Sequence, residues 1–438
     1  MSKSNTDIQI PEAIPELERG PVWLRQRRQS SRQSYNSTPI PQRGLHLWRY
    51  TDPQRFVVDR GDASDTVYDE NYDRIRQVEL KHLESGHLSA LVTDLGGREI
   101  EFYGIEKLGE RGVAVMPVSE AVEKHHDLVE RYLYELVSSS VGKFEAMNGA
   151  LWNDGIFIYV PDGVTVDRPI HLIRELGRTD SVQFPRLLVV VGKNAELTLV
   201  DEYGGGAFGT QAGTSYSNGA VEIFGLEGSR TRYVTLQRQS AATTSYLTHR
   251  AGIERGASML TLALAFGGAV TKQNFGVVLN GPGAESKIYG LLFGAGHQHF
   301  DNHTLHHHSS GQTRSDIDFK VVLRDRAISA YTGLIRIDPH AKSCEAYQEN
   351  RNLLLNKGCR AETIPELEIL NEDVTCTHGA TLGPIDPLMV HYLQSRGIEH
   401  REAVRMIVAG FVSDTLRQVP ADLRDRISEV VNQRLEHL

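Results

Sequence analysis

Residues 255–265 read RGASMLTLALA, a turn, a small residue and then alternating apolar positions, and this pattern indicates a core built of β-strands. Residues 282–292 repeat it as PGAESKIYGLL, and residues 325–335 repeat it as DRAISAYTGLI. Alternation of apolar and polar side chains is typical of a β-strand with one buried face. Further copies are GKNAELTLV (192–200), NGAVEIF (218–224) and KGCRAETI (357–364), and the small residues are Ala195, Ala220, Ala257, Ala284, Ala327 and Cys359.

These repeats predict a mainly β core over residues 144–382. Recurring units of turn, small residue and strand, without helices between them, indicate a sheet that stacks on itself, as in a solenoid or parallel β-helix. The copies lie roughly 25 to 43 residues apart, and this irregular spacing also permits a β-sandwich or a cupin-like double sheet. The repeats alone leave these architectures open.

The segment before the core, residues 1–143, is predicted to be an N-terminal arm followed by a mixed α/β domain. Residues 1–18 are polar and read as a loose arm. Apolar residues at helical spacing predict one helix over residues 119–137, which Ser119 can cap. Alternation on both sides of Gly96 and Gly97 predicts a hairpin.

The segment after the core, residues 383–438, is predicted to be a helical domain. The helices are expected over residues 387–395, around an apolar stripe that includes Phe411 and Leu416, and from Pro420 onwards. Three short amphipathic helices can bury one face against each other and still present a second apolar strip to a partner. The sequence does not decide whether the apolar stripe packs in the protein's own core or docks a partner.

Composition excludes several classes of protein. The 438 residues carry 47 Lys and Arg against 56 Asp and Glu, a net charge of −9, so nucleic-acid binding is not expected. Three cysteines cannot form a disulfide framework and fit a reducing cytosol. No apolar run approaches the ~20 residues that cross a bilayer, and the acidic N-terminal residues do not resemble a secretory signal. We therefore expect a cytoplasmic protein without a membrane partner.

Cys376 and His378 form the most unusual short motif, in the sequence DVTCTHGATLGPID at residues 373–386. Side chains two residues apart on a strand point the same way. A thiolate and an imidazole are good ligands for iron or zinc. Two donors cannot complete a tetrahedral site, so further ligands would come from elsewhere or from another chain. A cysteine at a strand end beside a hydrogen-bonded histidine is the plainer interpretation of the pair.

Several blocks in order along the chain resemble the SufD family, which supplies a subunit of the Suf (SufBCD) iron–sulfur cluster assembly scaffold. Residues 373–386 resemble the C-terminal signature of that family. The resemblance continues in AYQENRNLLL at 346–355, TIPELEIL at 363–370, YLQSRGI at 392–398, FEAMNGALWNDGIFIYVPDGVTVDRPIHL at 144–172 and the Trp48-Arg49-Tyr50-Thr51 block.

The resemblance implies a right-handed parallel β-helix core, and a scaffold subunit rather than an enzyme. It implies a heterodimer with SufB through the β core, and a SufC ATPase docked on the C-terminal helices. The chain could form a homodimer when it is alone. An iron–sulfur cluster would be assembled transiently at the interface with SufB, where His378 and Cys376 would be the metal-binding residues. No cluster is expected on the isolated chain.

A SufB-type sulfur-accepting paralogue is the nearest alternative. SufB-like chains carry a glutamate after the histidine of this motif and a sulfur-accepting cysteine inside the β core. Here Gly379 follows His378, and no cysteine precedes Cys344. Cys344 and Cys359 stand where the resembled family usually shows other small residues, and they are interpreted as buried fillers. These features favour SufD.

A histidine-rich stretch suggests a different chemistry. Two pairs with strand spacing, His297 with His299 and His306 with His308, could chelate a metal as in a cupin. No suitably spaced glutamate follows, and the Asp301, His303, Thr304 and His307 positions also resemble a block within the SufD β core. A histidine-rich strand and turn is the preferred interpretation.

Enzyme classes with recognisable motifs are not indicated. The sequence contains no phosphate-binding Gly-x-x-x-x-Gly-Lys-Ser/Thr loop, no Gly-x-Ser-x-Gly elbow and no His-Glu-x-x-His helix. Nucleotide hydrolysis would therefore fall to a partner. A β-helix enzyme acting on acidic polysaccharide is a remaining alternative, although such enzymes work outside the cell and need a groove of acidic calcium ligands.

Overall fold

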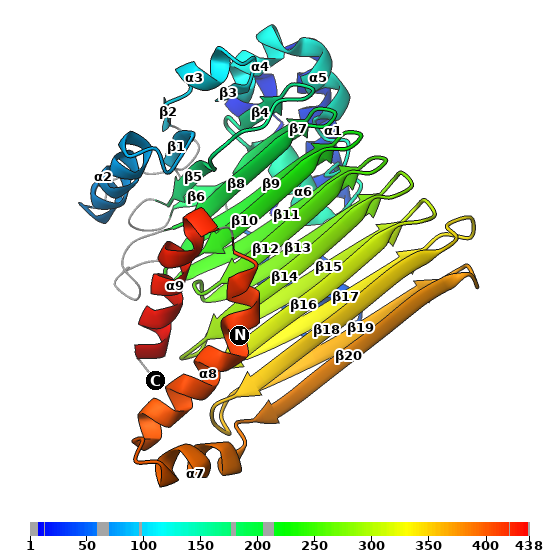
Figure 1. Ribbon diagram of the computed structural model, residues 1–438. Coiled ribbons are helices and arrows are strands. Elements are labelled where there is room, and N and C mark those ends of the chain that lie inside the picture. Colours follow the sequence, from blue (N-terminus) through cyan, green and yellow to red (C-terminus); the bar gives the residue numbers. More distant parts are fainter. Residues whose placement is uncertain are drawn as a thin grey trace, which may run out of the picture.

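A computed structural model describes residues 8–12, 14–58, 70–95, 99–176, 181–204, 214–419 and 421–436. Two long sheets run through the centre, with the N-terminal elements around one end (Figure 1). The C-terminal helices cross one face, and β20 lies at the end remote from the N-terminal elements (Figure 1).

Sheet A and sheet B each have ten strands in the described part of the chain. Sheet A has the order β2 (Glu99–Tyr103), β1 (Ala90–Leu95), β5 (Ile170–Glu175), β8 (Glu196–Tyr203), β10 (Arg230–Gln237), β12 (Ser258–Ala265), β14 (Glu285–Gly294), β16 (Arg314–Leu323), β18 (Cys344–Leu354), β20 (Val374–Pro384). Sheet B has the order β19 (Arg360–Ile369), β17 (Ile328–Ile337), β15 (His299–His308), β13 (Val270–Leu279), β11 (Thr243–Ile253), β9 (Ser215–Gly225), β7 (Arg186–Val191), β4 (Ile156–Val160), β3 (Ala114–Pro117), with β6 (Val182–Gln183) paired to β9.

From β7 to β20 the chain visits the two sheets alternately, and neighbouring strands in each sheet are parallel. A chain that winds in this way forms a parallel β-helix. The predicted core architecture is therefore confirmed, together with its N-terminal mixed region and its C-terminal helices. The sandwich and cupin-like alternatives do not have this alternation.

The repeated turns explain the sequence pattern. Gly256 and Gly283 have φ of 63° and 75°, a left-handed backbone that glycine adopts without steric cost. Each is followed by a small residue with no exposed surface, Ala257 or Ala284, and then by a strand. The NGAVEIF copy was interpreted wrongly, because Ala220 lies inside β9 and not at a turn.

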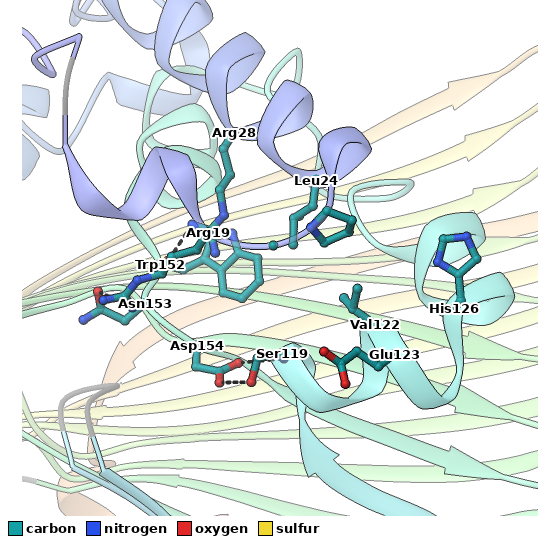
Figure 2. Close-up of a pocket in the computed structure, with 12 residues that line it drawn as sticks. Arg19, Leu24, Arg28, Ser119, Val122, Glu123, His126, Trp152, Asn153 and Asp154 are labelled. Atoms are coloured by element: carbon teal, nitrogen blue, oxygen red, sulfur yellow. Dashed lines mark hydrogen bonds between the residues drawn. The ribbon is translucent and has the colours of Figure 1, made fainter.

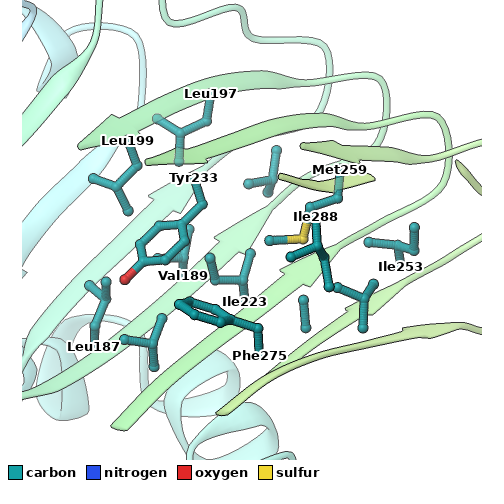
Figure 3. Close-up of a cluster of buried hydrophobic side chains, with 14 of the residues drawn as sticks. Leu187, Val189, Leu197, Leu199, Ile223, Tyr233, Ile253, Met259, Phe275 and Ile288 are labelled. Atoms are coloured by element: carbon teal, nitrogen blue, oxygen red, sulfur yellow. The ribbon is translucent and has the colours of Figure 1, made fainter. Parts of the chain in front are cut away.

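The interior between the sheets is filled by inward-facing apolar side chains. Figure 3 shows Tyr233 of β10 and Met259 of β12 packed against Ile223 and Phe275 of sheet B. All four are at most 3% exposed. Burying a side chain of this size contributes about 1.5–3 kcal/mol, so the stacked interior is the main source of stability of the core.

Short helices cover the outer face of sheet B and the start of the β-helix. The helices and 3₁₀ turns are η1 (Pro15–Glu18), α1 (Val22–Ser37), η2 (His46–Trp48), η3 (Pro53–Phe56), α2 (Glu70–Glu84), α3 (Glu106–Gly109), α4 (Val118–Lys124), α5 (His126–Tyr132) and α6 (Lys143–Leu151). Trp48, Phe56 and Phe144 pack with Tyr246 of β11 on that face. The aromatic cluster fixes the segment before α2 to the β-helix.

Three expectations for the N-terminal region can be compared with the structure. The hairpin is confirmed by antiparallel β1 and β2, although Gly96 and Gly97 lie outside the described residues. The helix over 119–137 is wrong, because α4 and α5 are separate helices that meet at His125, with φ −131° and ψ 40°. The loose arm is wrong for the described part of residues 8–18, where Ile10 and Leu17 are buried.

The C-terminal helices α7 (Pro387–Ser395), α8 (His400–Arg417) and α9 (Ala421–Glu436) follow β20 directly. Asp386 caps α7 by accepting a hydrogen bond from the Leu388 amide at 2.9 Å. Helices α8 and α9 pack on the outer face of sheet A, where Val408 and Val412 meet Leu262 and Leu291. Pro420, the predicted start of the third helix, lies outside the described residues. None of the described helices has the length and apolar character needed to span a membrane.

Candidate functional site

The last strand of the β-helix carries the candidate site. Strand β20 is the edge of sheet A and pairs with β18 alone among the described strands. Strand β19 is the corresponding edge of sheet B. The edge strands also expose large apolar side chains, since Leu382 is 50% exposed and Ile369 is 39% exposed. The β-helix therefore ends in open strand edges that a further chain can extend.

Cys376 and His378 lie on the same side of β20, as the two-residue spacing predicts. They are in register with Ala346 and Gln348 of β18, which are 6% and 0% exposed. The Cys376 side chain packs against the main apolar core together with Val374. His378 is exposed. The two side chains thus stand on the inward side of the final strand, where no following turn of the described chain covers them.

Partial burial sets the chemistry of the thiol. Burial raises the pKa of Cys376 above its usual value, because the charged thiolate loses hydration. The thiol is therefore mainly protonated at neutral pH unless a metal or a cationic partner stabilises the thiolate.

Gln348 lies next to His378 and was not predicted. Its Nε2 atom donates a hydrogen bond to the Gly333 carbonyl oxygen at 3.2 Å. A Cβ atom at Gly333 would lie 2.4 Å from that Nε2, so glycine is required for this approach. The Gln348 Oε1 atom is buried and has no hydrogen-bond partner among the described residues. Gln348 is in register with His378 on the next strand of sheet A.

Gly379, the residue after the histidine, faces the opposite side of β20. A Cβ atom at Gly379 would meet Glu349 Cγ at 3.8 Å. Glu349 accepts hydrogen bonds from Arg351 at 2.6 Å and from Tyr347 at 3.0 Å. The bond from Arg351 lowers the pKa of Glu349, so this carboxylate is charged at neutral pH. A glutamate at position 379 would place a second negative charge beside it.

The histidine-rich strand β15 is structural. His306 and His308 point into the core, where His306 Nε2 lies 2.9 Å from Ser286 Oγ and His308 Nδ1 lies 2.7 Å from Thr313 Oγ1. Burial lowers the pKa of His308 to about 4. His297 lies in the preceding turn, so the alternative of a chelating His297–His299 pair on one strand is wrong, and the stretch is the strand and turn that we preferred.

The outward face of β15 carries an ion-pair cluster. Asp301 bonds Lys272 at 2.8 Å, His303 at 2.7 Å and the Thr51 hydroxyl. The ammonium and imidazole donors hold the pKa of Asp301 well below its usual range despite its burial. No group of three or more His, Cys, Asp and Glu side chains in the described residues is arranged to hold a metal ion. The cupin-like interpretation is therefore not supported.

The two remaining cysteines lie where strands begin, Cys344 as the first residue of β18 and Cys359 immediately before β19. Cys344 is 1% exposed, and its Sγ atom lies 3.2 Å from Thr313 Oγ1 in the adjacent turn. Cys359 is 7% exposed and contacts the carbonyl oxygen of Leu323 at 3.4 Å. Both pack as small side chains in the wall of the β-helix.

Comparison with known families agrees with this architecture. The family described as "SUF system FeS cluster assembly, SufBD core domain" matches residues 174–411, more than half of the chain. The chain belongs to the SufBD family. The family's second part, the "SufBD protein N-terminal region", matches residues 17–172. The chain is therefore a scaffold-type member of an iron–sulfur cluster assembly system, which removes the polysaccharide-enzyme alternative.

Named SufBD relatives match almost the whole chain. The iron–sulfur cluster assembly protein SufB of Bacillus subtilis is 25% identical over 433 residues, covering 98% of this chain and 92% of the relative. SufBD family proteins of Staphylococcus saprophyticus and Staphylococcus aureus are 24% identical with the same coverage. These relatives agree with the SufBD family assignment and leave the subunit type, SufB or SufD, open.

The C-terminal helices also carry features that the sequence interpretation missed. Phe411 and Leu416 pack against the apolar cluster between α8, α9 and sheet A, so their stripe serves core packing. The exposed apolar strip lies on α7 instead, where Leu388 is 74% exposed and Tyr392 is 57% exposed. Leu388 and Tyr392 are four residues apart and share one helix face.

Proposed function

We propose that this SufBD family member is a SufD-type subunit, which forms a heterodimer with a SufB subunit and has no turnover chemistry of its own. The iron–sulfur cluster is its substrate and is assembled at the shared interface. The observation that carries the proposal is the exposed His378 beside Cys376 on the open terminal strand, followed by Gly379 instead of glutamate.

The distribution of cysteines supports the subunit assignment. The three cysteines of the chain are Cys344, Cys359 and Cys376, and none lies earlier in the β core. A SufB-type subunit needs an interior thiol that accepts sulfur. The two buried cysteines lie at the starts of strands and pack against backbone carbonyl oxygens, which is the environment of a structural cysteine.

In this proposal His378 is the principal ligand that the chain offers to the nascent cluster. A neutral imidazole binds iron through one ring nitrogen while a hydrogen bond from the other fixes the ring. Gln348 Oε1 is the acceptor for that second nitrogen. Cys376 supplies a thiolate once a metal stabilises its charge, and SufB supplies the remaining ligands because two donors cannot saturate iron.

The SufB subunit is proposed to pair with the open edges of β19 and β20. Edge strands offer unpaired backbone N–H and C=O groups to another strand. Leu382 and Ile369 would be buried at the same time. The same edges would allow a homodimer in the absence of SufB.

The SufC ATPase is proposed to dock on the C-terminal helical domain, residues 383–438, through the exposed strip of α7. The strip consists of Leu388, Met389 and Tyr392, with Met406 of α8 also exposed. ATP-driven movement of SufC would then be transmitted through α7, which follows β20 directly, to the strand that carries His378.

Two variants tested by co-purification separate these surfaces. The tagged chain is co-expressed with the SufB and SufC proteins of its own genome. Ala380→Pro removes a backbone donor from the free side of the edge strand β20, since the backbone of the next residue, Thr381, faces β18, and this variant should abolish co-purification of SufB while SufC is retained. The double variant Leu388→Asp with Tyr392→Asp should abolish co-purification of SufC while SufB still co-purifies. If the β20 variant and the α7 double variant both fold normally and both still co-purify with SufB and SufC, the proposed surfaces are wrong.

A SufB-type function is the second candidate, because the Bacillus subtilis relative named SufB covers nearly the whole chain. The discriminating experiment is mass spectrometry after incubation with a cysteine desulfurase and cysteine. A SufB-type chain would accumulate a persulfide on Cys344 or Cys359. The proposed SufD-type chain should carry none on these two residues, and a stoichiometric persulfide on either would replace the proposal by the SufB-type function.

A further inference from the structure

The N-terminal region contains a pocket of about 690 Å³, a size typical of small-molecule sites. It lies between the start of α1 and the helix α4, remote from β20, and Figure 2 shows the side chains that surround it. Its apolar surface comes from Leu24, Val122 and Trp152, which are at most 7% exposed. These side chains form a hydrophobic floor for a ligand.

Arg28 lines this pocket and is only 1% exposed. Its guanidinium group lies over the Trp152 ring, 3.8 Å from the ring centre, and its Nη1 donates a hydrogen bond to the Trp152 carbonyl oxygen at 2.7 Å. The Nε atom has no hydrogen-bond partner, and no carboxylate forms an ion pair with Arg28 in the described residues. A buried cation without an anionic partner is costly, so the site favours an anion.

The surrounding charges increase this preference. Arg19 lines the same pocket and donates a long hydrogen bond of 3.5 Å to Asn153 Oδ1. Burial lowers the pKa of Arg28, and the nearby Arg186 and Arg19 lower it further, whereas Tyr134 and Asp154 partly oppose this shift. An anion beside the guanidinium would offset all three effects.

The opposite wall limits the charge that a ligand can carry. Glu123 and Asp154 line the pocket, and Asp154 accepts hydrogen bonds from the Ser119 amide at 3.1 Å and hydroxyl at 2.6 Å. Two carboxylates disfavour a dianionic phosphate. They can accept a hydrogen bond from a neutral N–H or O–H group of the ligand.

We propose that this pocket binds a small monocarboxylate with an aromatic-sized apolar body. The carboxylate contacts Arg28, and the body lies against Trp152, Leu24 and Val122. A planar guanidinium is well suited to a carboxylate, and the apolar floor supplies affinity through burial. This site is independent of the cluster-assembly proposal.

The test uses matched probes and the full-length chain. N-acetyl-phenylalanine is compared by isothermal titration calorimetry with its neutral amide and with phenyl phosphate. The acid should bind at least about tenfold more tightly than the amide, because a hydrogen bond to a charged group is lost. Equal binding of acid and amide, no binding of the acid, or tighter binding of phenyl phosphate would each overturn the proposal.

Variants place the probe in this pocket. Arg28→Met should weaken binding of the acid at least about tenfold and leave the amide unchanged. Val122→Phe keeps Arg28 and fills the pocket, so it should also abolish binding, which keeps the test decisive if Arg28→Met does not fold. Arg27→Met is the matched control, because Arg27 is on the same helix and also bonds backbone carbonyl groups but does not line the pocket. Wild-type affinity in a folded Arg28→Met or Val122→Phe protein would overturn the assignment.

Discussion

Gln348 on β18 lies in register with His378 on β20, and its Oε1 atom is buried without a hydrogen-bond partner in the described residues. Neighbouring parallel strands bring such in-register side chains together. The pair therefore places a hydrogen-bond acceptor beside the imidazole that we propose as the ligand of the cluster.

A substitution at Gln348 tests this relationship. In Gln348→Leu the histidine keeps its strand but lacks the acceptor that we propose to fix its ring during cluster assembly, so cluster maturation should fall by about 10–100-fold. The free energy of unfolding should fall by only about 1 kcal/mol, for one lost hydrogen bond. Cluster maturation in cells and chemical denaturation measure the two effects.

Asn350→Leu is the matched control for that substitution. Asn350 is also a buried amide, donates to the Phe319 carbonyl oxygen at 3.1 Å, and is in register with Ala380 instead of His378. It should lose stability without a comparable loss of maturation. Similar maturation in Gln348→Leu and Asn350→Leu would show that Gln348 has only a structural role.

The C-terminal helices should respond differently to charges at packed and exposed positions. Phe411→Asp with Leu416→Asp places carboxylates in the interface between α8 and sheet A, and should destabilise these helices by several kcal/mol. Leu388→Asp changes an exposed residue of α7 and should alter stability by about 0.5 kcal/mol or less. Hydrogen exchange of residues 400–417 distinguishes the two. Equal protection in both variants would contradict the packing role of Phe411.

Much of the fold could be predicted from local patterns. The turns before Ala257 and Ala284 can be recognised in the sequence. A left-handed backbone position favours glycine, and the next residue must be small because it is fully buried. The repeat copy around Ala220 was placed at a turn but lies inside β9. A small residue followed by alternating apolar residues gives the same sequence pattern in both places. The break at His125 between α4 and α5 was not visible either, because the apolar spacing continues across it.

The candidate site also has features that the sequence predicts and features that it does not. The common orientation of Cys376 and His378 follows from the two-residue period of a strand. The position of Gln348 beside His378 could not be predicted, because it depends on the register between strands that are distant in sequence. The stripe with Phe411 could not be assigned, because a periodic apolar face does not say whether the protein's own sheet or a partner covers it.

Buried histidines should make stability depend on pH. Burial lowers the pKa of His308 to about 4 in the folded chain, whereas an unfolded histidine titrates near 6.5. The unfolded state therefore binds more protons in this interval, and the free energy of unfolding should fall by on the order of 3 kcal/mol between pH 6.5 and pH 4. The contribution of neutral His308 to the free energy of unfolding is therefore fully present only above about pH 6.5 and is lost as the pH falls towards 4.

The measurement is chemical denaturation of wild type and His308→Asn across that pH range. The variant starts less stable, because contacts with Thr313 and Ser315 change, but it should show a shallower decline towards pH 4. His340→Asn, in an exposed turn, should keep the wild-type slope. Parallel slopes in wild type and His308→Asn would contradict the assignment of the acid sensitivity to His308.

The three thiols should differ in reactivity. Cys344 and Cys359 are 1% and 7% exposed, so iodoacetamide should modify Cys376 first. Because burial raises the pKa of Cys376, its modification should be slow at pH 7 and accelerate towards pH 10. Complex formation at β20 should protect it. Peptide mass spectrometry follows each site, and equal labelling of Cys376 in the isolated chain and the assembled complex would place the interface elsewhere.

The central claim is that His378 acts in cluster assembly and contributes little to folding. The most direct measurement is rescue of a Suf-dependent strain lacking the native gene by His378→Ala, with complex formation measured in parallel. The variant should fold, retain its partners and fail to rescue growth, whereas Cys376→Ser should rescue at least in part. Full rescue by His378→Ala with an intact complex would contradict the account.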